Sequence, residues 1–390
     1  MVSTDSPVLS LRALNRATLA RQLLLSRTRM SAEDAVRHLV GLQAQNTKPP
    51  YYALAARLDG FRPEELSGLM ERREAARTVT MRSTLHTHTA EDVLGLGPLM
   101  QPARDREVRA FRKGLDGVDL DALTALTREL VEERPRTPKE IRTALLARWP
   151  DADPLALGVT ARCLLPLVQV TPRGLWNRSG QVALTTADVW FRGFRGSPRP
   201  APAGPAPAGP APAGPAPEFG LESVVVRYLL AFGPASVKDM QTWSGLTRLR
   251  DTFERLRPRL LTFRDPYGTE LFDLPDAPRP DPDTPAPPRF LPEFDNLLLS
   301  HADRSRVVPP AFKDRTWQGN QAYRTFLADG LLAGIWALEE AKGGSLTMTV
   351  QPFGTLSREQ RAAVADEAAL TLETLGGGAS YDVRFGAVAG

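Results

Sequence analysis

"SVKDMQTWSGLTRLRDTFERLRPRLLTFRDPYGTELFDL", residues 236–274, contains the local signals that decide the fold. Ser236 and Asp239 form a capping box that begins a helix, and Gly245 is a typical helix stop. A further helix follows, and then two strand-like runs flank "DPYG", a turn with Pro at its second position and Gly at its fourth. With the apolar helix "ESVVVRYLLAFG" before it, this order predicts three helices and a hairpin, which is a winged-helix unit.

The last helix of this unit is basic. Residues 236–264 hold seven basic and three acidic side chains. A basic helix of this kind can enter a DNA groove, so Arg248 and Arg250 are candidate DNA contacts. Charged helix-and-hairpin units also occur in proteins that never touch DNA, and a solvated surface remains the alternative.

The same plan recurs upstream in a less regular form. In residues 9–110 we expect helices, one of them capped by Ser31, and the strand-like run "ARTVTMRSTLHTHT". In residues 111–195, "TPKEIRTALLARWP" and "VTARCLLPLVQV" are expected as helices and "TPRGLWNRSGQVALTT" as a wing. These runs predict two further winged-helix units before the one at residues 219–288. The fold class expected is α+β, with tandem winged-helix units followed by a small C-terminal β-rich, barrel-like domain at residues 289–390.

A low-complexity insert interrupts this order. Residues 196–218 include "PAPAGPAPAGPAPAGPAP", a five-residue repeat that cannot form a core. Such a composition is typical of an exposed, partly polyproline-like tether.

Composition limits the class of protein. The single cysteine, Cys163, lies in the apolar run "ARCLLPLVQV" and is expected to pack in the core. A lone cysteine excludes an internal disulfide, and the chain has no run of 18 apolar residues and no signal-peptide pattern. We therefore expect a cytoplasmic protein without a membrane segment.

The basic residues favour arginine. Only six of the 49 basic residues are Lys, so 43 are Arg, and the net charge is +4. Arg is the side chain best suited to phosphate, which makes nucleic acid a candidate partner.

The run "HLVGLQAQNTKPPYY", residues 38–52, places two amides where an apolar residue is expected. The apolar stripe of the preceding helix, continued by three residues, arrives at Gln43. Pro49 and Pro50 disfavour continuation of the helix, and an extended chain from Leu42 would place Gln43 and Gln45 on the same side. Two amides could then converge on one small polar group. The alternative is a buried Gln43 satisfied by backbone and a merely exposed Gln45.

Five blocks of the sequence resemble a known family. In order they are "LNRATLARQLLL", "VRHLVGLQAQ", "TVTMRSTLHTHTAED", "RFLPEFDNLLLSHADRSRVV" and "TFLADGLLAGIW". Together they resemble the AlkZ-like winged-helix DNA glycosylase superfamily over nearly the whole chain apart from the insert. "QAQ" matches the Gln-x-Gln catalytic motif at Gln43 and Gln45, whereas the YcaQ branch has an acid at the second position.

The resemblance implies a chemistry for the two amides. Guanine alkylated at N7 is cationic, so its glycosidic bond is already weak, and the enzyme must hold a water and stabilise an oxocarbenium-like sugar. The implied activity is a monofunctional glycosylase, without lyase action, on N7-alkylguanine in double-stranded DNA, in the form of bulky adducts or interstrand crosslinks. Self-resistance to a DNA-alkylating natural product is the implied role. No cofactor and no obligate protein partner is expected, and a monomer acting on the nucleoid suits a lesion without two-fold symmetry.

Supporting residues follow from the same blocks and from charge. One of two histidines in "STLHTHT" is expected to contact phosphate or orient the site, with a polar, solvated strand face as the alternative. Only four histidines are present, so a zinc site is not expected. Arg82, just before these histidines, is a candidate phosphate clamp. Arg304 and Arg306 of "HADRSR" are expected to contact the DNA backbone beside the lesion, with a structural turn paired by Asp303 as the alternative. The candidates are His86, His88, Arg82, Lys48, Arg304, Arg306, Arg248 and Arg250.

Two other classes of function compete with the glycosylase. A winged-helix transcription regulator would dimerise and bind one DNA sequence, and it would be unaffected by loss of Gln45. A non-catalytic protein that sequesters a drug would bind the free compound and produce no abasic DNA. Polar residues on a core-facing stripe favour the glycosylase, because neither alternative needs them.

Overall fold

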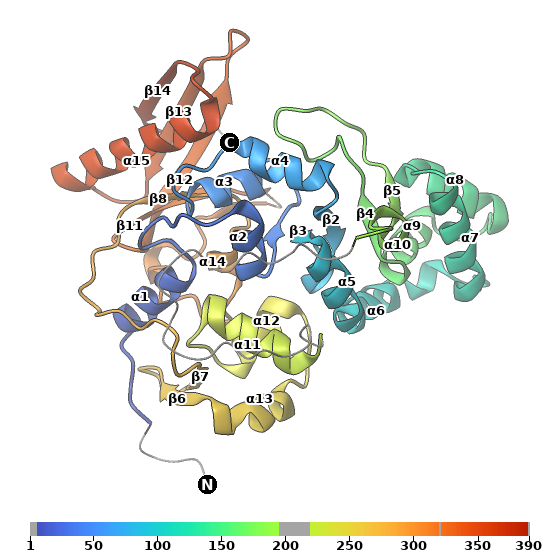
Figure 1. Cartoon of the computed structure of the whole chain (residues 1–390), viewed down its shortest axis with the longest axis horizontal. Coiled ribbons are helices and arrows are strands. Elements are labelled where there is room, and N and C mark those ends of the chain that lie inside the picture. The colour runs from blue at the N-terminus through green and yellow to red at the C-terminus, as the bar shows by residue number, and fades with distance from the viewer. Residues whose placement is uncertain (1–5, 195–218, 320, 389–390) are drawn as a thin grey trace.

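The computed structural model describes residues 6–194, 219–319 and 321–388, and the predicted insert at 196–218 lies outside the described residues. Figure 1 shows an N-terminal part in blue, with a helical lobe on one side, a helix-and-hairpin part below it and a C-terminal sheet above it. No helix in the described parts of the chain is both long and apolar enough to cross a membrane.

The N-terminal part is mainly helical. Its helices are α1 (Leu11–Arg21), α2 (Ala32–His38), α3 (Pro49–Ala55), α4 (Pro63–Glu71), α5 (Ala90–Leu99) and α6 (Gln101–Ala110), with the short 3-10 turns η1 (Met81–Ser83) and η2 (Arg112–Gly114). The Ser31 side chain accepts a hydrogen bond from the Asp34 N–H and caps α2 as expected.

Helix α2 ends at His38, and the chain is extended at Leu42 and Gln43, as the proline-rich continuation suggested. The expectation for Pro49 and Pro50 themselves is wrong, because they begin α3 and do not continue an extended segment. Proline is tolerated in the first turn of a helix because the N–H that it lacks has no partner there.

A five-stranded antiparallel sheet lies at the centre of residues 6–194. Its strands are β1 (Leu42–Gln43), β2 (Ala75–Val79), β3 (Leu85–Thr89), β4 (Leu167–Gln169) and β5 (Leu184–Thr186), in the order β1-β3-β2-β4-β5. Strands β2 and β3 confirm the strand-like run predicted there. The sheet joins strands from both sides of residue 110, so the first two predicted units share it.

The lobe of residues 120–190 packs three helices on this sheet. They are α7 (Leu120–Glu133), α8 (Pro138–Arg148) and α9 (Pro154–Leu164), followed by the short α10 (Ala187–Trp190). Leu123, Ile141, Leu145 and Leu157 form its core. Cys163 is fully buried, as expected. The helix expected across "VTARCLLPLVQV" ends at Leu164, and the remainder forms β4.

The elements predicted between residues 219 and 275 are confirmed. They are α11 (Leu221–Phe232), α12 (Val237–Ser244), α13 (Arg250–Leu256), the turn η3 (Arg257–Arg259), and the hairpin β6 (Leu261–Arg264) and β7 (Glu270–Asp273). Ser236 and Asp239 make both hydrogen bonds of the capping box, and Gly245 ends α12 with a φ of 78°. Tyr228, Phe232 and Trp243 pack their rings at the centre.

The C-terminal part is a five-stranded sheet covered by one long helix. Its strands are β8 (Arg289–Leu291), β11 (Arg324–Ala328), β12 (Leu331–Glu340), β13 (Leu346–Pro352) and β14 (Tyr381–Phe385), in the order β14-β13-β12-β11-β8. The helix is α15 (Arg358–Gly376), and shorter elements are α14 (Asn296–Leu299), η4 (Pro310–Phe312), β9 (Trp317–Gln318) and β10 (Gln321–Ala322). Within the part expected to be β-rich, the run "NLLL" therefore forms the helix α14, capped by Asp295. In the described residues β8 and β14 are the two edges of an open sheet.

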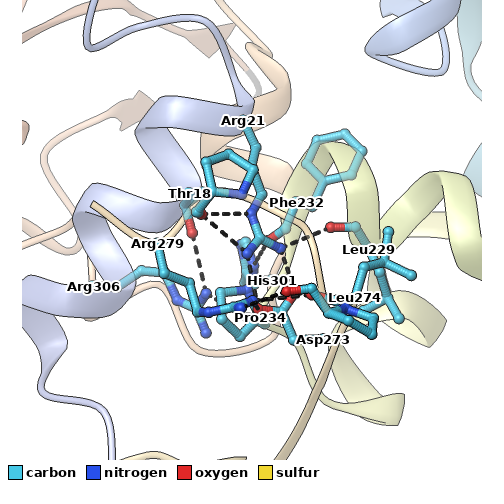
Figure 2. Close-up of polar contacts among 12 residues, drawn as sticks. Thr18, Arg21, Leu229, Phe232, Pro234, Asp273, Leu274, Arg279, His301 and Arg306 are labelled. Atoms are coloured by element: carbon cyan, nitrogen blue, oxygen red, sulfur yellow. Dashed lines mark hydrogen bonds and ion pairs between the residues drawn. The ribbon is translucent and has the colours of Figure 1, made fainter. Parts of the chain in front are cut away.

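Buried polar contacts fix the helix-and-hairpin part to its neighbours. Arg21 of α1 forms two hydrogen bonds with the Asp273 carboxylate at the end of β7, and both side chains are fully buried. Arg279 also contacts Asp273, while Arg306 donates to the Pro234 carbonyl (Figure 2). Helix α1, the helix-and-hairpin part and the segments that follow it therefore meet in one polar cluster.

Candidate active site

The Gln-x-Gln segment begins with a sharp change of chain direction after α2. Val40 and Gly41 both have positive φ, 55° and 88°. A Cβ at Gly41 would lie 2.3 Å from the His88 ring, so only glycine fits this approach. The chain then enters β1, where Gln43 lies directly opposite His86 in the antiparallel ladder with β3.

Gln43 is buried, with an exposed fraction of 7%. Its side-chain oxygen accepts a hydrogen bond of 2.6 Å from the Arg82 guanidinium. Hydrogen bonds from a charged donor are stronger than neutral ones and hold their geometry better. The partner of Gln43 is therefore a charged side chain and not the backbone group considered from the sequence.

Gln45 is exposed, and its side-chain oxygen accepts a hydrogen bond of 3.0 Å from the Leu85 N–H. Both amides are thus held by the segment 82–85, which connects β2 to β3. Each amide oxygen has two lone pairs, so each keeps one after these bonds. The Gln-x-Gln segment therefore carries one buried amide, Gln43, and one exposed amide, Gln45.

The two histidines of β3 are buried, which contradicts the alternative of a solvated strand face. Burial lowers the pKa of His86 well below its ordinary value and that of His88 to about 4, so both are neutral near neutral pH. His86 Nδ1 lies 2.9 Å from the Thr84 carbonyl, and His88 Nε2 lies 2.8 Å from the Thr80 hydroxyl. Neither is placed to contact phosphate, and both support the strand that pairs with Gln43.

A second polar group, not found from the sequence, flanks Gln45. The Asn46 side chain donates to the Glu293 carboxylate at 2.9 Å, and Arg324 donates to the other carboxylate oxygen at 3.1 Å. Arg77, which is buried, donates to the Ala44 carbonyl at 2.6 Å. Glu293 lies inside a block that resembles the family, but nothing local signals its contact with Asn46.

Comparisons with known proteins show the family to which the chain belongs. The family described as "DNA glycosylase AlkZ-like" matches residues 36–373. The chain belongs to the AlkZ-like DNA glycosylase family. The solved structure of the Streptomyces sahachiroi DNA glycosylase AlkZ is similar in fold, with a TM-score of 0.75 and 22% sequence identity over 97% of this chain and 100% of that one. No curated protein sequence matches the chain.

Within this AlkZ-like chain, the other predicted site residues lie in different environments. Lys48 lies directly before α3, and its ammonium is 3.7 Å from the Glu340 carboxylate. Arg304 is half-buried, with a 3.5 Å hydrogen bond to the Leu298 carbonyl. Arg248 is exposed in the loop before α13, whereas Arg250 forms ion pairs with Glu254 and Glu270.

Arg306 requires a correction. It was expected to contact the DNA backbone, but it has an exposed fraction of 6% and donates to the Pro234 carbonyl and the Thr18 hydroxyl. Figure 2 shows this guanidinium inside the polar cluster. Its donors are used to join α1 to the residues before α12, and it is not available to DNA.

Proposed function

We propose that this AlkZ-like glycosylase hydrolyses the N-glycosidic bond of N7-alkylguanine in double-stranded DNA, with Gln43 and Gln45 as the catalytic amides. The observation that carries the proposal is the pair of side-chain oxygens held by one segment, at Arg82 and Leu85, each with a lone pair to spare. Such oxygens can accept the hydrogens of a water and face the positive charge that develops on the sugar.

The exposed amide is the better group to hold the water. Gln45 faces solvent and is anchored by a neutral N–H, whereas the Gln43 oxygen already contacts a cation. A neutral amide is a poor proton acceptor. Weak activation of the water is sufficient here because the N7-alkylated guanine leaves easily. The reaction therefore suits a cationic leaving base and not an unmodified guanine.

The aromatic residues near the motif favour a bulky lesion. Tyr51 and Tyr52 are buried in the core, where they pack against Trp176 and Trp336. Enzymes that act on small lesions turn the damaged base out of the duplex and stack side chains on it. Tyr51 and Tyr52 are not free to take that role. The burial of these two rings supports action on bulky adducts or crosslinks. The proposed role, self-resistance to a DNA-alkylating compound, rests on the family resemblance.

The absence of lyase action is part of the proposal. A lyase needs an amine that attacks the sugar carbon. Lys48 is the lysine nearest the motif in sequence, and its ammonium lies near Glu340 and 5.6 Å from the centre of the Trp176 ring. We expect an intact abasic strand as the product.

The proposed DNA path follows the end of α6 and the turn η2. Arg109, Arg112 and Lys113 are exposed, and no acidic side chain of the described residues forms an ion pair with them. Helix α6 lies beside η1, because Ser83 donates to Glu107. Arg106 of α6 also donates to the Gly245 carbonyl, and exposed Arg248 follows in the same loop of the predicted winged-helix unit. Unpaired cations of this kind bind DNA phosphates, and the affinity that they contribute falls steeply as the salt concentration rises.

A duplex with a single N7-methylguanine tests the proposal. After incubation with the protein, mild alkali cleaves the strand at any abasic site, and a denaturing gel shows the cut. We expect cleavage at the lesion only after alkali, none in an unmodified duplex, and strongly reduced cleavage with Gln45→Ala. Failure on this duplex and on duplexes with bulky N7 adducts would contradict the proposal.

A further inference from the structure

Arg82 lies in an unusual backbone position between β2 and β3. Arg82 and Ser83 both have positive φ, 51° and 56°, which few residues other than glycine adopt. The guanidinium is half-buried and reaches two groups. One nitrogen donates to Gln43 Oε1 at 2.6 Å, and another donates to the Trp243 carbonyl.

The Trp243 carbonyl lies at the end of α12. The last four carbonyls of a helix have no partner within the helix, and cations are favourable there because of the helix dipole. Arg106 of α6 donates in the same way to the Gly245 carbonyl. A Cβ at Gly245 would lie 3.0 Å from the Arg82 Cα, so this glycine permits the close approach. Two arginines thus bind the end of one helix, but only Arg82 also contacts Gln43.

Both groups that accept hydrogen bonds from the Arg82 guanidinium are neutral oxygens. No acidic side chain of the described residues forms an ion pair with it, and burial lowers its pKa to about 10, so it stays charged near neutral pH. A cation can accept no hydrogen bond, so the Gln43 amide must turn its oxygen toward Arg82 and its NH₂ group away. Without the guanidinium, both orientations of the amide would be open.

We propose that Arg82 is a positioning residue, which fixes the orientation of the catalytic Gln43 amide and is itself held by the end of α12. The inference rests on the proposed function and adds a specific link to it. The part of the chain at residues 219–275 is thereby connected to the reacting amide through one side chain. Arg82 is not, on this account, the phosphate contact that its charge and position in the sequence suggested.

Single-turnover kinetics and DNA-binding measurements on an N7-methylguanine duplex separate the two roles. We expect Arg82→Ala to reduce the rate constant by about 10- to 100-fold, because a small displacement of a catalytic group is costly, with the Kd changed less than about 2-fold. Arg82→Lys should recover only part of the rate, since a single ammonium cannot span both carbonyls in the planar geometry of a guanidinium. Melting temperatures confirm that the variants are folded.

A double-mutant cycle tests whether Arg82 acts through Gln43. In a Gln43→Ala background, Arg82→Ala should lower the rate constant less than about 2-fold further, because the two residues form one unit. Arg106→Ala is the matched control, since it removes the other arginine at the same helix end without touching Gln43. We expect it to leave the rate constant within about 3-fold of wild type.

Three results would overturn the inference while the proposed function stands. The first is a weaker Kd and a smaller salt dependence for Arg82→Ala at an unchanged rate constant, as a phosphate contact predicts. The second is a loss of rate constant on Arg82→Ala in the Gln43→Ala background that equals the loss in the wild-type background. The third is an equal loss of rate in Arg106→Ala. A wild-type protein inert on every N7-alkylguanine duplex would overturn the proposed function and this inference together.

Discussion

Gln45 Oε1 accepts a hydrogen bond of 3.0 Å from the Leu85 N–H, so the exposed amide of the Gln-x-Gln segment is anchored by the first residue of β3. The anchor needs an oxygen acceptor but not an amide. Side-chain position and side-chain charge at this site can therefore be tested separately.

Replacement of Gln45 should distinguish these two requirements. We expect Gln45→Ala to lose at least about 100-fold in the single-turnover rate constant, a loss typical of removing one electrostatic stabiliser. Gln45→Glu keeps the acceptor and should retain more activity, with a rate that rises with pH as the carboxylate ionises near its ordinary pKa of about 4.3. Equal losses in both variants would show that the oxygen is not the reacting feature. Wild type, with two amides that do not titrate, should show no such rise.

Substitution at the end of α6 and in η2 should affect DNA binding and not chemistry. We expect the triple variant Arg109→Ala, Arg112→Ala, Lys113→Ala to bind duplex DNA more weakly. The slope of log K against log salt should become shallower by about 0.9 for each phosphate that the variant no longer binds. Arg128→Ala on α7 is the control, because Arg128 is already paired with Glu132 and Asp188. Equal binding by the triple variant and wild type at low salt would exclude these three residues from the DNA path.

The buried polar cluster of Figure 2 should contribute strongly to stability. Asp273→Ala leaves Arg21 without its carboxylate in a fully buried position, which should cost about 3–5 kcal/mol in the free energy of unfolding. Asp283, with a 93% exposed side chain, is the control, and Asp283→Ala should cost less than about 0.5 kcal/mol. Urea denaturation of the two variants measures both values, and similar costs would contradict the role of the cluster.

The neutral histidines of β3 predict an acid-sensitive fold. Burial lowers the pKa of His88 to about 4 and that of His86 still further in the same direction. Between about pH 6.5 and pH 4 the unfolded chain binds protons that the folded chain does not, so stability falls as pH falls through this window. Each histidine should contribute up to about 1.4 kcal/mol per pH unit there.

Thermal denaturation of wild type and His88→Gln at several pH values measures this dependence. The variant should have a lower melting temperature than wild type near neutral pH and a smaller decline toward pH 5. An identical decline in both proteins would show that His88 does not titrate as its burial requires.

Local signals made the helix-and-hairpin part predictable. The capping box at Ser236, the stop at Gly245 and the "DPYG" turn act over a few residues, so they survive in the structure. The helix that begins at Pro49 was not predicted, because proline breaks the interior of a helix but is favourable in its first turn. The shared sheet was not predictable, because pairing of β2 with β4 joins segments about 90 residues apart and depends on tertiary packing.

The candidate site also has a part that the sequence predicts and a part that it does not. Gln43 and Gln45 were found from a break in an apolar pattern and from a family resemblance. The contacts that hold them were not, because Asn46 and Glu293 are separated by 247 residues, and the link from Arg82 to Trp243 spans 161. The burial of His86 and Arg306 was missed for the same reason, since polar side chains become buried only when distant partners satisfy them.

The most direct test of the account is the detection of both products in one reaction. A duplex with a single N7-methylguanine would be incubated with excess wild-type protein or with the Gln43→Ala, Gln45→Ala double variant, and mass spectrometry would follow the free base and the DNA strand. The account predicts free 7-methylguanine and an intact abasic strand in equal amounts with wild type, and almost none with the double variant. Release of the base at the same rate by both proteins would contradict the assignment of the two amides as the catalytic residues.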